Sequence, residues 1–356
     1  MKTNYLKTTL VFLILALITA PVFSSSKEDF SKPIKKEFNI SKGAVLSINS
    51  EFTDIKAINW AKDVISVEVI ITVDAKNAEK AKSRFENVTM EIDGNEKQVT
   101  IITGLDKTYF GNKKNNNIDI EVLIYYPEHI QLDLNNEFGS NIFENISGIV
   151  NVDIAYGSFK AASITNSDVD IDMEFGKINI ERIQSGTVDV AYGEFNTTTA
   201  GVIKLNSEFS SNEIESIERL DLNSAYDKVY IGNVNNIFAN KEFTSLRIDK
   251  LGKSLKLVTA YGSIKVNNIA SDFELIDVQS EFTGVHLNFP TNPSFAFKAS
   301  VEMGDIKYPK DLVSITNYEK EMFSLDLEGY FGNAKDDSPK VILSLENASA
   351  YIKINE

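Results

Sequence analysis

Residues 169–193 read VDIDMEFGKINIERIQSGTVDVAYG, and the pattern in this stretch predicts the fold. An aromatic residue followed by glycine occurs twice, as Phe175-Gly176 and Tyr192-Gly193. Before each aromatic residue, apolar and polar residues alternate with the period of two that is typical of a half-buried β-strand. After it the alternation resumes in a shifted phase. The stretch therefore predicts a unit of two short strands joined by a corner.

The unit recurs along most of the chain, with 17 to 21 residues between successive aromatic positions. These positions are Phe138, Tyr156, Phe175, Tyr192, Phe209, Tyr226, Phe243, Tyr261 and Phe282, with Met303 in the tenth place and Phe52 in the same frame near the N-terminus. This spacing leaves no room for two strands and a helical crossover, so successive units must stack directly on one another. We expect an all-β chain folded as a single-stranded parallel β-solenoid (a β-helix), with about 17–21 residues per rung.

The same alternation predicts which side chains face the core. With the aromatic residue numbered zero, position -4 is apolar in all ten units, from Leu134 to Ala299. The aromatic residue has the parity of position -4, so we expect one inward column of rings from Phe138 to Phe282 and no exposed aromatic stripe. Glycine is frequent at position +1, where it fits a corner with unusual backbone dihedral angles.

Four segments are predicted. Residues 1–24 read as a signal peptide, because Lys2 and Lys7 precede an apolar run at residues 10–20 and small residues follow. An uncleaved anchor is the alternative, although the run is too short to span a bilayer. Residues 25–131 form an N-terminal capping β region with a first rung and a short helical excursion, 132–308 the solenoid repeats, and 309–356 an insertion and C-terminal capping rungs. The protein is expected to be exported to the periplasm or cell surface of a bacterium.

Composition excludes several functions. The formal net charge of -15 gives no counterion-release attraction to nucleic acid or to anionic membrane surfaces. The absence of Cys removes disulfides, thiol catalysis and thiolate metal sites. No second apolar stretch reaches membrane length, so the mature chain is predicted to have no membrane span.

Two outward columns carry acidic groups. Position -1 alternates Glu and Ala, which separates like charges on stacked rungs. Position -3 carries Asp153, Asp172 and Asp189, and oxygen ligands of this kind suit Ca²⁺. No calcium-loop motif accompanies them, so a solvated acidic face is the favoured interpretation and a Ca²⁺ site the alternative.

We find no catalytic constellation in the sequence. His129 and His286 are far apart and lie in no metal-ligand spacing, and no nucleophile or phosphate-loop motif is present. Acidic pairs are too abundant to single one out as a glycosidase pair. We therefore expect no enzyme activity, no catalytic residues and no cofactor.

The organisation resembles the DUF4097 family, labelled an adhesin family, and the related DUF2807 proteins of bacterial envelopes. The resemblance rests on Phe38-Asn39-Ile40, on residues 46–52 (LSINSEF), on Tyr126-Pro127, and on the recurring Glu/Ala-Phe/Tyr-Gly phrase. It implies an extracytoplasmic β-solenoid and supplies no catalytic residues.

The main hypothesis is a non-enzymatic cell-envelope protein, a candidate adhesin or surface binding or structural module, whose partner is an envelope protein or a polysaccharide. Two alternatives stay open. One is a polysaccharide-active enzyme of the lyase type built on a β-helix, which would need a basic residue beside the aspartate column. The other is an accessory of an envelope sigma/anti-sigma system.

Overall fold

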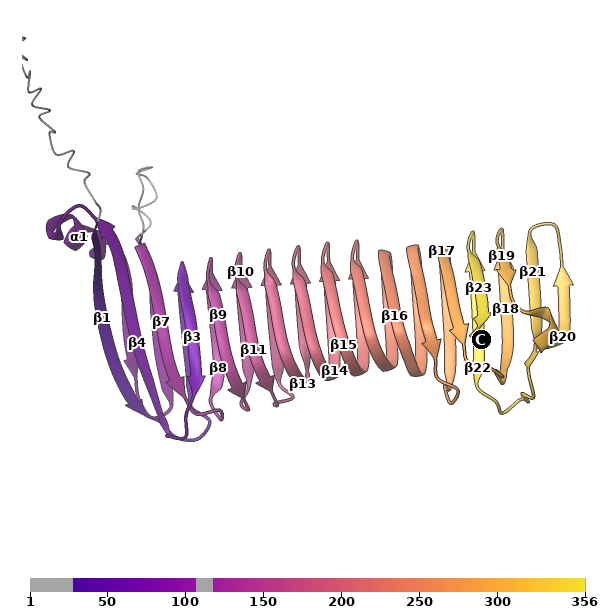
Figure 1. The fold of residues 1–356 in the computed structure, drawn as a ribbon, viewed down its shortest axis with the longest axis horizontal. Coiled ribbons are helices and arrows are strands. Elements are labelled where there is room, and N and C mark those ends of the chain that lie inside the picture. The colour runs from indigo at the N-terminus through magenta and orange to yellow at the C-terminus, as the bar shows by residue number, and fades with distance from the viewer. Residues whose placement is uncertain (1–27, 107–117, 356) are drawn as a thin grey trace, which may run out of the picture.

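The protein is an elongated solenoid in the computed structural model, which describes residues 28–106 and 118–355. Its strands run across the long axis in two layers, front and back in Figure 1. All of them belong to one continuous hydrogen-bonded sheet of 23 strands within the described residues, because several strands bend from one layer into the other. The predicted all-β solenoid is confirmed. The expected signal peptide, at residues 1–24, lies outside the described residues.

The first layer contains the strands that precede the corner aromatic residues, and further strands extend it at both ends. In spatial order these are β5 (Val88–Gly94), β6 (Gln98–Leu105), β2 (Val45–Glu51), β8 (Gln131–Glu137), β10 (Val150–Ala155), β12 (Val169–Glu174), the second halves of β13 (Lys177–Ala191), β14 (Glu194–Glu208) and β15 (Ser211–Ala225), parts of β16 (Lys228–Ile269), the first half of β17 (Leu275–Phe289), β22 (Lys340–Glu346), β18 (Phe295–Glu302), β21 (Ser324–Phe331) and β20 (Val313–Lys320).

The second layer contains the strands that follow the corners, and β1, β4 and β7 extend it at the N-terminal end. In spatial order these are β1 (Glu28–Asn39), β4 (Val64–Ala75), β7 (Ile118–Tyr126), β3 (Thr53–Asn59), β9 (Ser140–Ile146), β11 (Ser158–Ile164), the first halves of β13, β14 and β15, parts of β16, the second half of β17, β23 (Ser349–Ile354) and β19 (Asp305–Lys307). Pairing is parallel along the repeats and antiparallel only toward the two ends, at β1, β4, β5, β20 and β21.

The core lies between the layers and is filled by the columns that the sequence predicted. Position -4 is buried throughout, from Leu134 at 1 % exposure to Ala299 at 1 %. The single α-helix of the described residues, α1 (Ala78–Phe85), is capped by Asn77, whose Oδ1 accepts a hydrogen bond from the Lys80 N–H at 3.0 Å. It falls within the predicted helical excursion and packs beside β4.

The order of strands differs from the order of the chain at both ends. The rung β2–β3 comes first in the sequence, yet it lies between the rung β6–β7 and the rung β8–β9. The rung β22–β23 comes last, yet it lies between β17 and the pair β18–β19. The sequence suggested capping rungs at 309–356, but β22–β23 is internal. A 3₁₀ turn, η2 (Lys310–Leu312), leads instead to β20 and β21, which end the first layer.

Candidate binding surface: an exposed aromatic ladder

The corner aromatic residues adopt a left-handed backbone conformation. Their φ angles lie between 48° and 59° from Phe52 to Phe282, where an L-residue is normally disfavoured. A residue in this conformation reverses the course of the chain at one position. The corner is therefore the aromatic residue itself, not the glycine that follows it.

This geometry overturns one prediction. The strand alternation was expected to place the rings in an inward column, but the left-handed residue breaks the alternation and turns its side chain outward. The nine rings from Phe138 to Phe282 are 42–53 % exposed. An exposed aromatic stripe is therefore present, and sequence parity alone missed it.

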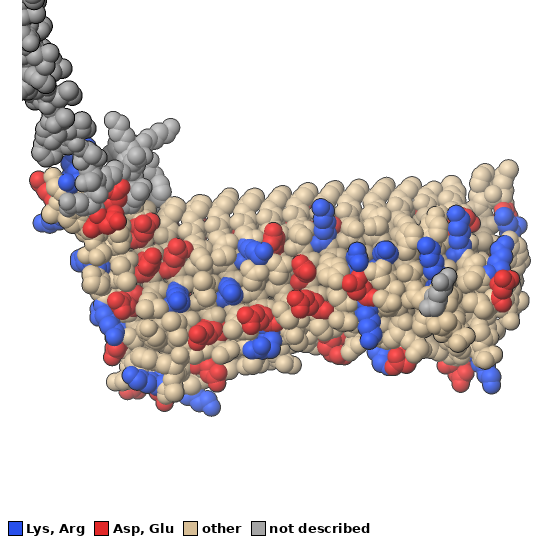
Figure 2. Space-filling view, in the orientation of Figure 1, with Lys and Arg blue, Asp and Glu red and all other residues tan. Residues whose placement is uncertain are grey.

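The rings stack on one another along the solenoid. Ten of them, Phe52, Phe138, Tyr156, Phe175, Tyr192, Phe209, Tyr226, Phe243, Tyr261 and Phe282, form an unbroken ladder that we call the aromatic ridge. Successive ring centroids are 4.7–5.0 Å apart, and the ring planes differ by only 1–9°. The ridge follows the rung spacing, so it is straight and about 45 Å long. A regular row of uncharged side chains forms the upper edge in Figure 2.

Glycine at position +1 has a packing role. A Cβ on Gly157 would lie 2.3 Å from the Gly139 carbonyl oxygen, and one on Gly176 would lie 2.3 Å from that of Gly157. Where the residue is Ser or Thr, its hydroxyl group turns back to the chain, and at Asp227 a buried carboxylate takes this place. Thr244 Oγ1, for example, donates to the Glu242 carbonyl at 2.9 Å. The corners are thus packed backbone on backbone, which fixes the rung spacing and the ring stacking.

Ring orientation limits what the ridge can bind. Each inner ring covers the faces of its neighbours, so the ridge presents ring edges to solvent. Face-on stacking of a sugar is therefore blocked along the inner rings of the ridge. The edges offer C–H groups and, on alternate rungs, a tyrosine hydroxyl. Such a surface suits apolar and hydrogen-bonding groups of a protein partner.

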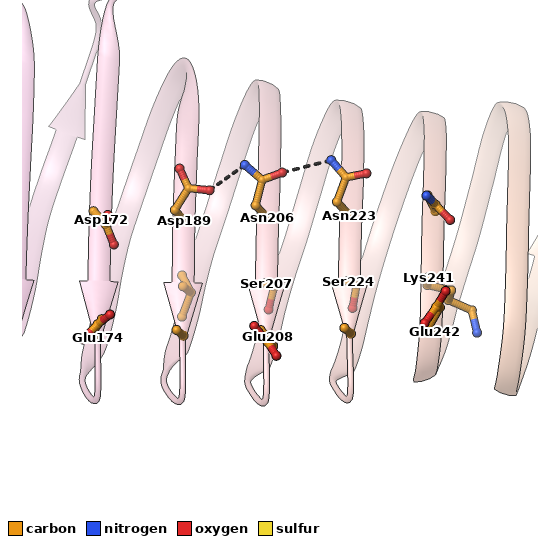
Figure 3. A pocket seen from close by; sticks show the side chains of 14 residues that line it. Asp172, Glu174, Asp189, Asn206, Ser207, Glu208, Asn223, Ser224, Lys241 and Glu242 are labelled. Carbon is orange, nitrogen blue, oxygen red and sulfur yellow. Dashed lines mark hydrogen bonds between the residues drawn. The ribbon is translucent and has the colours of Figure 1, made fainter.

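The acidic column lies beside this ridge on the outer face of the first layer (Figure 3). Asp153, Asp172 and Asp189 are in register on neighbouring strands. Burial raises the pKa of the Asp172 carboxyl, and the negative charges of Asp153 and Asp189 raise it further. The column continues as an amide ladder, in which Asn206 donates to Asp189 at 2.5 Å and Asn223 donates to Asn206 at 2.9 Å.

Nothing in the described residues gathers three or more His, Asp or Glu side chains into a group that could hold a metal ion. Asp172 and Asp189 line a shallow groove of about 420 Å³ that also includes Asn206, Asn223 and Lys241, whereas Asp153 lies outside it. Each aspartate projects from its own rung, and the groove is an open trough. The Ca²⁺ site therefore stays a prediction.

A buried polar cluster lies beneath this groove, and sequence analysis missed it. Lys241, at position -2, is 1 % exposed, and its Nζ donates to the Thr244 carbonyl at 2.7 Å. Burial lowers the pKa of Lys241 to about 8. On the next rung, Asp227 is 3 % exposed and accepts from Ser224 Oγ and from the Ser210 N–H, both at 2.6 Å. A lysine in an otherwise inward column was the signal that could have revealed the cluster.

The two histidines are not brought together. His129 Nε2 lies 2.9 Å from Asp63 Oδ1, close to the N-terminal end of the solenoid. His286 lies on β17, and its ring stacks on that of Tyr351. Arg219, one of the arginines that a lyase-type site could use, pairs with Asp221 at 3.2 Å and does not line the groove of Asp172 and Asp189.

None of the helices in the described ranges is long and apolar enough to cross a membrane. Comparison with curated proteins finds no match.

Several solved structures are similar. One is a candidate adhesin from Parabacteroides distasonis, with 12% identity, covering 73% of this chain and 97% of that one, at a TM-score of 0.35. A second, from the same species, is a candidate lipid-binding protein, with 12% identity, 90% and 96% coverage, and a TM-score of 0.32. A third is a candidate cell adhesion protein from Clostridium sporogenes, with 12% identity, 92% and 100% coverage, and a TM-score of 0.20.

The family comparison covers most of the chain. One family model matches residues 44–334, which include the β2–β3 rung, the repeats and the end of the first layer. The chain belongs to the Toastrack DUF4097 family.

Proposed function

We propose that this protein is an exported, non-catalytic binding module of the bacterial cell envelope, and that its partner contacts the aromatic ridge. The observation that carries the proposal is the exposure of the ridge. Nine stacked rings are 42–53 % exposed in one straight line. Exposed apolar patches of this extent are uncommon on monomeric soluble proteins and mark interaction sites.

The shape of the ridge favours an extended partner. Each ring is held by a stack on both sides and by a corner packed backbone on backbone, so little side-chain entropy is lost on binding. Because the rings present edges, a protein segment fits better than a polysaccharide chain stacked face-on. The alternating Glu column beside the ridge would favour partners without acidic groups along this line.

The test compares two triple variants of the full chain. Tyr192→Ser/Phe209→Ser/Tyr226→Ser removes the centre of the ridge. Ile142→Ser/Val202→Ser/Val258→Ser removes three apolar side chains that are 41–51 % exposed elsewhere on the surface. Binding of each protein to isolated envelopes of the source bacterium is measured, before and after protease treatment of the envelopes.

We expect the ridge variant to bind at least about tenfold more weakly than the parent, and the control variant to bind normally, because central aromatic residues dominate interface energies. Protease treatment should abolish binding. Equal binding by the parent and the ridge variant would overturn the proposal. So would polysaccharide turnover by the parent that a single Asp or Glu substitution abolishes.

A further inference from the structure

A second surface lies on the outer face of the second layer, toward its C-terminal end. Four side chains occupy equivalent outward positions on neighbouring strands, namely Lys265 on β16, His286 on β17, Tyr351 on β23 and Lys307 on β19. Lys353 follows two residues after Tyr351 and faces the same side of the sheet. Lys and Arg side chains gather toward this end of the face shown in Figure 2.

The centre of this row is an ordered pair of rings. The His286 and Tyr351 rings stack with centroids 4.6 Å apart and planes 5° apart. The Lys307 ammonium lies 5.2 Å from the centroid of the Tyr351 ring. The Tyr351 ring thus holds the His286 imidazole in place from one side, and the Lys307 ammonium lies over the Tyr351 ring.

The row carries uncompensated positive charge. Lys265, Lys307 and Lys353 have no ion pair within residues 28–106 and 118–355, whereas Lys253 and Lys298 each reach a carboxylate within 2.8 Å. Burial lowers the pKa of His286, and the charges of Lys353 and Lys265 lower it further. Like charges on adjacent strands are destabilising, and they occur here in a chain of net charge -15.

Two carboxylates near this row, those of Asp249 and Asp305, already accept hydrogen bonds from other groups. On the β16 side, Asp249 accepts from Tyr230 and Asn267, both at 2.6 Å. On β19, Asp305 Oδ1 accepts the Ile306 N–H at 2.9 Å. Around His286 itself, β16 presents Lys265 and β23 presents Tyr351 and Lys353.

A gap in the surface opens beside the imidazole. Position +2 of this rung is Gly284, and the nearest atom to a Cβ placed there would be His286 Nε2, at 4.0 Å. Ser263 pairs with Gly284 on β16, and Ser349 occupies the same position on β23. The gap beside Gly284 is therefore bordered by the hydroxyl groups of Ser263 and Ser349 and by the His286 imidazole nitrogen, and the charges of Lys265 and Lys353 act on that imidazole. The hydroxyl groups and the imidazole can all donate hydrogen bonds to an anion once the imidazole is protonated.

We propose that the surface formed by Lys265, Gly284, His286, Tyr351, Lys307 and Lys353 binds a phosphate group. A protonated imidazole beside this gap, with Lys265 on one neighbouring strand and Lys353 on the other, favours a doubly charged anion over a single carboxylate. A bound dianion also offsets the repulsion between the lysines and His286, so binding is coupled to protonation of the imidazole. The phosphate is either free in solution or carried on a lipid headgroup, and the experiment separates these sources.

The test uses proton NMR of the full chain, which contains only two histidines. The C2–H resonances of His129 and His286 are assigned with a His129→Gln variant. They are then titrated with pH in inorganic phosphate and in sodium chloride of equal ionic strength. Chloride is essential because simple screening of the lysines also raises the pKa of His286. Vesicles of phosphatidylcholine with and without phosphatidic acid test the lipid-borne source.

We expect a saturable rise in the pKa of His286 of about one unit in phosphate beyond that in chloride, which corresponds to tenfold tighter binding by the protonated form. His129, beside Asp63, should show no such rise. Lys265→Gln/Lys353→Gln should weaken phosphate binding at least about tenfold. The matched control is Lys56→Gln/Lys160→Gln, which removes two outward lysines that flank Ile142 in the same column.

Each outcome of these experiments either supports or overturns the proposed phosphate site. Saturable binding of inorganic phosphate assigns the site to soluble phosphate groups. Binding only to vesicles that contain phosphatidic acid, lost in Lys265→Gln/Lys353→Gln, assigns it to lipid-borne phosphate. Equal shifts in phosphate and chloride together with no vesicle binding would overturn the proposal, as would equal effects of the two double variants. None of these results depends on the aromatic ridge.

Discussion

At the scale of single residues, Lys241 is the side chain whose placement has the clearest energetic consequence. It is almost fully buried, makes one hydrogen bond to a backbone carbonyl, and has a pKa lowered to about 8. A lysine in the unfolded chain keeps its ordinary pKa near 10.5. The unfolded state therefore binds more protons between these values, and stability contributed by this group rises as pH increases from about 8 to 10.5.

Lys241→Met tests this expectation. The variant should be more stable than the parent at pH 7, because it removes a charge that burial disfavours, although it leaves the Thr244 carbonyl without its partner. Its advantage should shrink by about 3 kcal/mol between pH 7 and 10.5, as the parent lysine becomes neutral. Urea unfolding of both proteins across this range measures the difference. A difference that does not change with pH would show that Lys241 titrates normally.

The corner aromatic residues show where sequence reasoning reached its limit. Alternation correctly identified the buried positions around Phe209, including Leu205 and Ile214. It failed at Phe209 itself, because a φ of 50° is a property of one residue that no period-2 pattern encodes. The signal in the sequence that could have revealed the corner is the small residue at position +1, here Ser210. In the structure the Ser210 side chain is buried, so the residue after the aromatic ring faces the core in its place.

At the scale of the structural element, a glycine at corner position +1, Gly157, can be compared with a glycine at the outward position +2 of another rung, Gly284. A Cβ on Gly157 would clash with backbone at 2.3 Å, whereas the nearest atom to a Cβ on Gly284 is a side-chain nitrogen at 4.0 Å. Neither glycine has a positive φ, so backbone strain does not distinguish them. The two positions therefore form a matched pair for testing close packing.

We expect Gly157→Ala to cost about 3 kcal/mol of unfolding free energy, because the clash can be relieved only by moving one rung away from the next. Gly284→Ala should change stability by less than about 0.5 kcal/mol. Chemical denaturation with matched m-values measures both. Similar effects of the two substitutions would mean that rung spacing is not set by contact between corners.

At the scale of the whole molecule, repeat counting predicted the stacked architecture but not the order of strands at the ends. The capping rungs expected within residues 309–356 include one with alternating apolar residues at Val341, Leu343, Ala350 and Ile352, and these residues are buried. The sequence could not show that this rung enters between β17 and β18, because both neighbours present the same pattern. Local periodicity shows which segments form rungs, whereas long-range packing decides which rungs lie next to one another.

The position of β22–β23 leads to a prediction about truncation. Removing residues 340–356 should deprive β18, β19 and β21 of their link to the rest of the stack, since β18 and β19 reach the solenoid through this rung. Amide hydrogen exchange should then show loss of protection over residues 295–331. Removing residues 1–39, which takes away only the edge strand β1 of the described chain, should leave that region protected. Unchanged protection after the C-terminal truncation would contradict the strand order.

The interleaved ends also restrict how such a chain can change length in evolution. At either end, an added unit would have to enter between strands that are already paired, so growth by duplication is confined to the uninterrupted repeats from β8 to β17. There, Phe with a preceding Glu alternates with Tyr and a preceding Ala. A duplication of two rungs preserves this order, whereas a duplication of one rung places identical residues side by side and brings two glutamates to adjacent rungs in one of the two cases. Adjacent glutamates do occur outside these repeats, where Glu51 lies opposite Glu137 and Glu281 lies opposite Glu346. Within the uninterrupted repeats the favoured unit of duplication is therefore the pair, and homologous solenoids built on this plan should differ in length mostly by even numbers of rungs.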